Sequence, residues 1–325
     1  MSKSYTVVID TLGSDKGPES IIKGTCMIME QRSDLKICFT GDKNLISEKL
    51  KDFGADMNRV KIIDAPELIT NYEHPVMAVN QKVNSSLVKA LVETGTNDDC
   101  IGMISAGSTG AVLVGSMMHL KTEQLQRPCL AAILPAQKGG FMCVVDTGAT
   151  IDCTSDMLVH FAHLGSDLIK RLYKIDHPKV GLLSNGAEET KGNALVKETY
   201  PLLKNDASVN FVGNIEGSNA LSGDCDVLVC DGFAGNQVLK VSEGIARRLI
   251  KDIMKIAKET ENDSYMELAK KLAGMYDFNS LGGAIVLGIR KTVMKAHGAA
   301  NENTIVNITK MLLKMADNKA DFLSE

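Results

Sequence analysis

The chain has 325 residues, of which 44% are hydrophobic and 4% are aromatic, and its formal charge is −4 at pH 7. This length can form a substantial core, as one large α/β domain or two smaller ones. The acidic balance, the few aromatic side chains and the absence of Trp argue against a nucleic-acid-binding protein. No apolar stretch approaches the ~20 residues that a membrane-spanning helix requires.

Short β-branched runs alternate with longer segments of helical period. In chain order, strands are predicted at residues 5–9, 36–40, 60–64, 100–105, 130–134, 141–146, 179–184, 209–212, 226–230 and 284–289. The helical segments include residues 74–94, 109–121, 154–172, 193–204 and 236–260. Continuous apolar character suits strands that are covered on both faces. The sequence therefore predicts an α/β fold, with helices on both sides of a mostly parallel sheet.

The chain contains no internal repeat and no linker rich in Pro or Ser, so we predict a single domain over residues 1–325. One segment differs in composition, because residues 247–278 read as two amphipathic helices joined by the polar turn ETENDS (259–264). We therefore expect a helical hairpin, over residues 240–278, that stands out from the sheet.

The eight cysteines lie mainly in apolar runs and form no CxxC pair. We interpret them as reduced core residues of a cytosolic protein, rather than as metal ligands or disulfide partners. The first residues lead directly into a predicted strand, without the apolar region of a signal peptide.

Polar, glycine-rich loops recur where strands end. They read DTLGSDKGP (10–18), SAGSTG (105–110), DTGATID (146–152), SNGAEETKGN (184–193), DGFAGN (231–236) and KAHGAAN (295–301). Open α/β sheets bind ligands at the carboxyl ends of their strands, and glycine lets several N–H groups point at one anion. Each loop alone could be an ordinary turn, but the whole set favours an anion site.

These loops lack the signatures of larger phosphate ligands. No GxGxxG follows a strand and no GxxxxGK[ST] is present, so the dinucleotide and P-loop motifs are missing. The GxxG turns in SAGSTG and DGFAGN suit a smaller phosphate group.

Lys191 is the most informative residue of the loops. It precedes the predicted helix at residues 193–204, where a lysine opposes the helix dipole unless an anion lies between them. The alternative is a solvated lysine that pairs with Glu188 or Glu189.

Other candidate sites are weaker. His160 and His163 share a predicted helix without a further ligand at metal spacing, so we interpret them as packing residues and expect no metal. Nothing near Cys153 would lower its pKa, so we interpret it as a buried thiol. No GxSxG or triad pattern is present. His297, on a glycine-flanked turn, is the one histidine that we place in a site.

Eight stretches, taken in order, carry a family resemblance. They read IDTLGSDKGPE, ISAGSTGAVLVGS, RPCLAAILP, VDTGATIDC, GLLSNGAEETKGNALVKETY, NFVGNIEGSNALSGDCDVLVCDGFAGNQVLK, LGGAIVLGI and VMKAHGAAN. Together they resemble the PlsX family, the acyl-acyl-carrier-protein:phosphate acyltransferases of bacterial phospholipid synthesis. The ordered set spans nearly the whole chain and is far more specific than any one of its motifs.

The resemblance implies a three-layer α/β/α sandwich related to isocitrate dehydrogenase and phosphotransacetylase, in a homodimer. It implies that inorganic phosphate attacks the thioester of acyl-ACP, which gives acyl phosphate and free acyl carrier protein (ACP), with no cofactor. The alternatives are a phosphotransacetylase-like enzyme that uses acyl-CoA and a non-catalytic protein that binds acyl-ACP.

The resemblance also implies roles for the loop residues. Lys191 would bind phosphate and neutralise the transition state, while Asn236 would donate to phosphate or to the thioester oxyanion. Further phosphate contacts are expected from Ser105, Gly107, Ser108, Thr109 and His297. Loop-orienting roles are expected for Asp10, Asp15, Asp146 and Asp231.

Two positions depart from the usual family pattern. Residues 12–15 read LGSD where the family usually reads MGGD, and Ser108 stands where SAGNTG has Asn. Serine still donates a hydrogen bond but reaches less far, so a weakened phosphate site and an altered substrate preference are both open.

ACP is strongly acidic, so its docking surface should be basic. The first predicted hairpin helix carries Arg247, Arg248, Lys251, Lys255 and Lys258, and the second carries Lys270 and Lys271. An ordinary solvated face is the alternative. The polar ETENDS turn would lie poorly in lipid, so we expect a cytoplasmic protein and leave weak peripheral membrane contact open.

Overall fold

The computed structural model describes residues 4–122, 127–276 and 283–322. The single domain over residues 1–325 stays a prediction. By its internal contacts the chain groups into two compact units. Unit 1 comprises Met1–Leu130, Arg171–Tyr173 and Asn279–Glu325. Unit 2 comprises Ala131–Lys170 and Lys174–Phe278.

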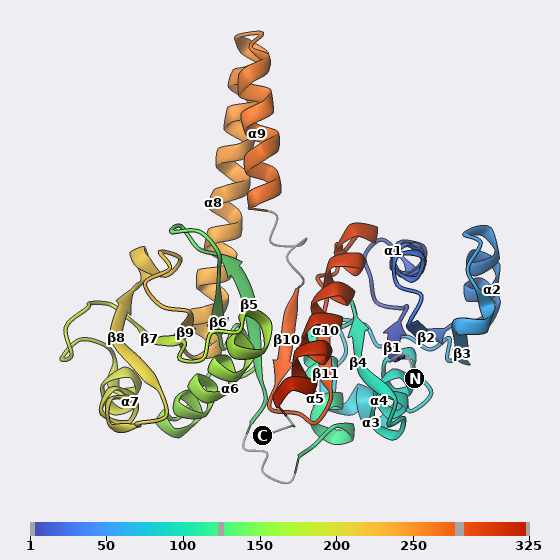
Figure 1. The fold of residues 1–325 in the computed structure, drawn as a ribbon, viewed down its shortest axis with the longest axis horizontal. Helices are drawn as coiled ribbons and strands as arrows, with labels where there is room; N and C mark the ends of the chain where they lie inside the picture. The colour runs from blue at the N-terminus through green and yellow to red at the C-terminus, as the bar shows by residue number, and fades with distance from the viewer. Residues whose placement is uncertain (1–3, 123–126, 277–282, 323–325) are drawn as a thin grey trace. The chain divides into compact units, whose positions relative to one another are not determined.

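Unit 1 is built on a mostly parallel sheet with the strand order β3-β2-β1-β4-β11-β10 (Figure 1). Its strands are β1 (Tyr5–Asp10), β2 (Leu35–Gly41), β3 (Val60–Asp64), β4 (Cys100–Ser105), β10 (Ala284–Leu287) and β11 (Thr292–Lys295). Only the β10–β11 pair is antiparallel among these described strands. Val7, Val8 and Ile9 are all fully buried, and because successive side chains point to opposite faces, both faces of β1 are covered.

The helices of unit 1 include one difference from the prediction. They are α1 (Pro18–Gln31), α2 (Lys43–Asp52), α3 (Pro75–Gln81), α4 (Ser86–Thr96), α5 (Thr109–His119) and α10 (Glu302–Phe322), with the short 3₁₀ helix η1 (Met57–Arg59). The single helix predicted over residues 74–94 is therefore two helices. The break arises because the Ser85 hydroxyl accepts from Val88 N–H and starts a new helix.

Unit 2 has the strand order β5-β6-β9-β7-β8. Its strands are β5 (Cys129–Pro135), β6 (Phe141–Val145), β7 (Lys179–Ser184), β8 (Asn210–Glu216) and β9 (Val227–Val229), with the 3₁₀ helix η2 (Gly217–Asn219). Within this order only the β5–β6 pair runs antiparallel. Leu134, Met142, Val144 and Leu228 form part of one buried cluster.

The helices of unit 2 end in a long hairpin. They are α6 (Ser155–Tyr173), most of which belongs to this unit, α7 (Ala194–Asn205), α8 (Gly232–Glu259) and α9 (Asp263–Met275). Helices α8 and α9 pack against each other, with Ala257 and Ala269 buried, and stand out from the other elements of unit 2 (Figure 1). A hairpin was predicted over residues 240–278, of which 277 and 278 lie outside the described residues.

None of the described helices combines the length and the apolar character that crossing a lipid bilayer requires. The eight cysteines form no disulfide, and all are buried except the half-buried Cys153. Their placement in the core agrees with the prediction.

Candidate active site

Three of the six glycine-rich loops meet in unit 1, because β1, β4 and β11 are parallel neighbours and end at one edge of the sheet. A Cβ atom added to Gly13 would lie only 2.5 Å from the Cα atom of Gly107. The Asp15 N–H donates to the carbonyl of Gly298 at 2.8 Å. The loops at residues 10–18, 105–110 and 295–301 are thus held against one another.

A buried carboxylate lies beneath these loops. Asp10 is 2% exposed and accepts hydrogen bonds from the hydroxyls of Ser105, at 2.7 Å, and Ser86. Burial raises the pKa of Asp10, and these hydrogen bonds and the charge of Lys295 oppose that effect. Because Ser105 Oγ also accepts from Gly107 N–H at 3.1 Å, Ser105 supports its own loop from below.

The first turn of α5 leaves backbone donors open. Ser108 is the N-cap residue and is 8% exposed, but its side chain makes no capping hydrogen bond. Within the described part of the chain, the N–H groups of Thr109 and Gly110 have no acceptor. His297, in the neighbouring loop, is exposed, and its Nδ1 accepts from Ala299 N–H at 3.1 Å. The turn can therefore receive an anion.

The other three loops belong to unit 2, where β6, β9 and β7 are parallel neighbours. The Asp146 carboxylate accepts from three N–H groups of its own loop, with the shortest bond, 2.6 Å, from Thr150. The Thr150 carbonyl accepts from Gly232 N–H at 2.8 Å. The loops at residues 146–152 and 231–236 are consequently joined.

Asn236 is the fifth residue of α8 and contacts the 146–152 loop. Its Nδ2 donates to the Thr147 carbonyl at 3.2 Å, and a Cβ added to Gly148 would lie 3.3 Å from the same nitrogen. An amide nitrogen carries two hydrogens, so one remains for a ligand. Asp231 caps the helix by accepting from Ala234 N–H at 2.8 Å.

Lys191 is exposed at the end of the 184–193 loop and forms no ion pair with the described residues. Of the two acids considered as partners, Glu189 instead pairs with Lys204 at 2.8 Å. Glu188 accepts from the backbone N–H of Lys191 through its carbonyl, not through its carboxylate. The ammonium group of Lys191 is therefore available to a ligand.

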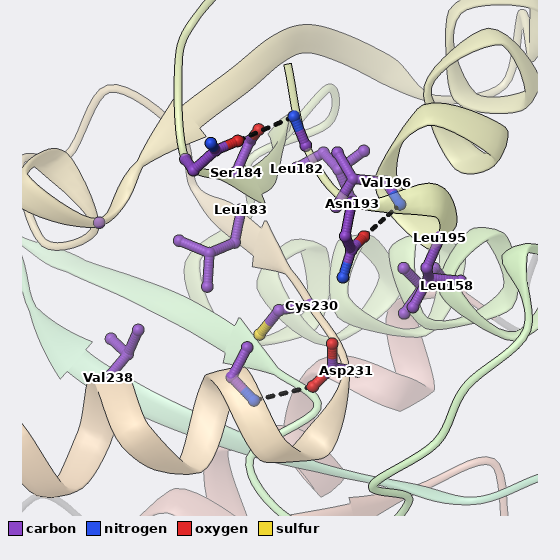
Figure 2. Close-up of a pocket in the computed structure, with 14 residues that line it drawn as sticks. Leu158, Leu182, Leu183, Ser184, Asn193, Leu195, Val196, Cys230, Asp231 and Val238 are labelled. Carbon is purple, nitrogen blue, oxygen red and sulfur yellow. Dashed lines mark hydrogen bonds between the residues drawn. The ribbon is translucent and has the colours of Figure 1, made fainter.

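An apolar cleft of about 550 Å³ adjoins the 184–193 loop within unit 2 (Figure 2). It is lined from β7, α6, α7 and the start of α8, and both ends of the loop, Ser184 and Asn193, contribute to it. Ser184 Oγ is buried and makes no hydrogen bond with the described residues.

The predicted docking residues Arg247, Arg248, Lys251 and Lys255 are all exposed on α8. Two of them pair along their own helix, Arg248 with Asp252 at 2.8 Å and Lys255 with Glu259 at 3.6 Å. The other two, Arg247 and Lys251, form no ion pair within the described residues.

The remaining candidates are explained by their surroundings. Burial raises the pKa of the Cys153 thiol to about 11, so the thiol stays protonated near neutral pH. His163 Nε2 lies 2.9 Å from an Asp206 oxygen. Across the described residues, no three His, Cys, Asp or Glu side chains gather as a metal site.

Comparison with known proteins decides the family. The family described as "Fatty acid synthesis protein" matches residues 5–320. The phosphate acyltransferase of Clostridium perfringens is 39% identical over 322 residues, which cover 96% of this chain and 93% of that protein. The phosphate acyltransferase of Clostridium acetobutylicum is 39% identical over 321 residues, covering 96% of each chain. The chain belongs to this family.

The resemblance to the PlsX family is thereby confirmed. Among solved structures, the phosphotransacetylase of Streptococcus pyogenes matches with a TM-score of 0.62 at 16% identity, covering 98% of this chain and 95% of that one. This likeness supports the fold alone. The predicted α/β fold with a mostly parallel sheet is confirmed.

In this PlsX family member, one unusual serine has a structural role. Ser14 Oγ donates to the Gly298 carbonyl at 3.2 Å and accepts from Lys16 N–H at 3.3 Å. No role was predicted for Ser86 or Ser184. Ser184 begins the SNGAEETKGN loop, but nothing in that pattern indicates that its hydroxyl is buried. Ser86 lies inside a helical segment, and its partner Asp10 is 76 positions away.

Proposed function

We propose that the protein transfers a fatty acyl group from the thioester of acyl-ACP to inorganic phosphate, and that the acyl phosphate serves phospholipid synthesis. The observation that carries this proposal is the 39% identity, over nearly the whole chain, to proteins named phosphate acyltransferase. In the same proposal the protein acts as a cytoplasmic homodimer.

The proposed reaction places few demands on acid–base groups. A phosphate oxygen attacks the carbonyl carbon, a C–O bond forms, and the C–S bond breaks. The proton that phosphate loses ends on the departing thiol. Phosphate is already partly dianionic at neutral pH, so the protein must chiefly hold that charge and stabilise the oxyanion.

Lys191 and Asn236 are the proposed catalytic residues of unit 2. Lys191 forms no ion pair with any residue that the structure describes, which supports its role as a phosphate ligand. The second Nδ2 hydrogen of Asn236 supports a role as a donor to phosphate or to the thioester oxyanion.

Ser108, Thr109 and Gly107 are the proposed phosphate contacts of unit 1, together with His297. The open N–H groups of the first turn of α5 support this assignment. Ser105 belongs to the same proposed phosphate site and acts by supporting the 105–110 loop through Gly107 N–H. The proposed role of Asp10, Asp15, Asp146 and Asp231 is to orient their loops.

The test is to mix purified protein, palmitoyl-ACP and inorganic phosphate, and to search for palmitoyl phosphate by mass spectrometry. We expect the product only when all three components are present. A parallel reaction with palmitoyl-CoA identifies a phosphotransacetylase-like enzyme if that donor is preferred. Binding of palmitoyl-ACP without phosphate-dependent thiol release would show a non-catalytic protein and reject the proposal.

A further inference from the structure

The cleft in unit 2 has walls of aliphatic side chains. Leu158, Leu182 and Val196 are nearly fully buried in its walls, and Leu183, Leu195 and Val238 are half-buried. Every lining residue lies in the described part of the chain, and none of them is Lys, Arg, His or aromatic. A phosphate group would find no cation there, and a nucleotide base would find no ring to stack on.

The polar side chains of the cleft are largely engaged already. Figure 2 shows Asn193 bonded to Val196 N–H, at 2.9 Å, and Asp231 bonded to Ala234 N–H. Asn185 Oδ1 accepts from Gly192 N–H at 2.8 Å. What remains for a ligand is mostly aliphatic surface, and a flexible hydrocarbon is the ligand that gains most from it.

The position of the cleft indicates which end of the hydrocarbon would lie next to the 184–193 loop. Ser184 and Asn193 line the cleft and also bound the loop that carries Lys191. A chain that fills the cleft would therefore have one end at the loop proposed to act on the thioester.

We propose that this cleft holds the acyl chain of the substrate, with its carbonyl end toward the 184–193 loop, and that Leu195 and Val238 set the chain length. The proposal deepens the proposed function and rests on it for the identity of the substrate. The two proposals can be tested separately, because fatty-acid binding to the cleft can be measured without any acyl transfer.

The binding of hexanoate, decanoate, myristate and palmitate to the full chain is measured by calorimetry. Affinity rises roughly fourfold for each methylene that enters the cleft. Leu195→Phe fills part of the cleft and lowers palmitate affinity about fifteenfold, as roughly two displaced methylenes would, while hexanoate binding is unchanged. Val238→Phe gives the same pattern from α8, should Leu195→Phe fail to fold.

The matched control is Leu202→Phe, which adds the same ring to the same helix at an exposed position outside the cleft. This variant binds all four fatty acids like the wild type. If the three variants give equal affinities at every chain length, the cleft is not the acyl site, even if acyl phosphate is formed. If palmitate binding follows the predicted pattern but no acyl phosphate forms, the cleft assignment stands and the proposed reaction fails.

Discussion

Ser105 and Ser184 each end a strand, but their hydroxyls differ in hydrogen bonding. Ser105 Oγ bonds to buried Asp10 and to Gly107 N–H, whereas Ser184 Oγ is buried without a described partner. We expect Ser105→Ala to lower the free energy of unfolding by about 1–3 kcal/mol, because Asp10 loses a donor. Ser184→Ala should leave the free energy of unfolding unchanged or raise it by up to ~1 kcal/mol, because the Ser184 hydroxyl is buried without a described partner. Urea unfolding measures both, and an equal loss in the two variants would contradict this account.

Lys191 and Asn236 are expected to affect turnover more than stability. Asn236→Ala should lower kcat by ~10²–10³, the usual cost of removing a positioned donor. It also loses the bond to Thr147, which costs about 1 kcal/mol of stability. Lys191→Met should lower kcat/KM for phosphate by about two orders of magnitude without changing the unfolding midpoint, since the side chain is exposed and makes no ion pair among the described residues.

Lys197→Met is the matched control for the lysine, because Lys197 is exposed on the helix that follows the same loop. Phosphate kinetics and unfolding are measured for both variants. Equal kinetics for Lys191→Met and Lys197→Met would remove Lys191 from the mechanism.

Lys191 and Asn236 could be put forward as candidates from the sequence because each lies in a motif next to a helix start, and their catalytic roles stay predictions. The buried contacts between Asp10, Ser86 and Ser105 could not be predicted, since they depend on strand register and on the entry of α4. No local pattern in the sequence encodes either feature.

At the scale of elements, the hairpin carries a testable basic face. Arg247 and Lys251 form no described ion pair, so their charges are the most available to an acidic partner. We expect Arg247→Glu/Lys251→Glu to raise the KM for acyl-ACP about tenfold at low ionic strength, and the difference should shrink as salt is added.

The control for this reversal is Lys36→Glu/Lys43→Glu, which makes the same change in net charge at exposed positions of unit 1. Steady-state kinetics at several salt concentrations compare the two variants. If both raise the KM equally, net charge explains the effect and the hairpin has no special part in docking.

Strand positions were well predicted where apolar runs are continuous. Residues 60–64, 100–105 and 179–184 coincide with β3, β4 and β7. Strand β11 was not among the predicted strands, because its apolar run is only Val293 and Met294 and its last residue is a lysine. Lys295 is nevertheless 8% exposed, so tertiary packing overrides its usual preference for solvent.

At the scale of the whole molecule, the length of the chain is compatible with one domain or two, and its composition does not mark the boundary between the two contact-based units. The chain crosses between them without a segment rich in Pro or Ser, and the last part of unit 1 follows all of unit 2 in the sequence. Three loops belong to each unit, so the grouping of the six loops depends on chain topology rather than on composition.

Helix α8 is one uninterrupted element of 28 residues, from the turn that holds Asn236 to the tip of the hairpin. At 1.5 Å per residue, it is a rod about 42 Å long. Its start carries the Asn236 amide that donates to the Thr147 carbonyl, and its outer turns carry the basic residues proposed to dock the carrier protein. One continuous helix would therefore connect the proposed docking surface to a proposed catalytic residue.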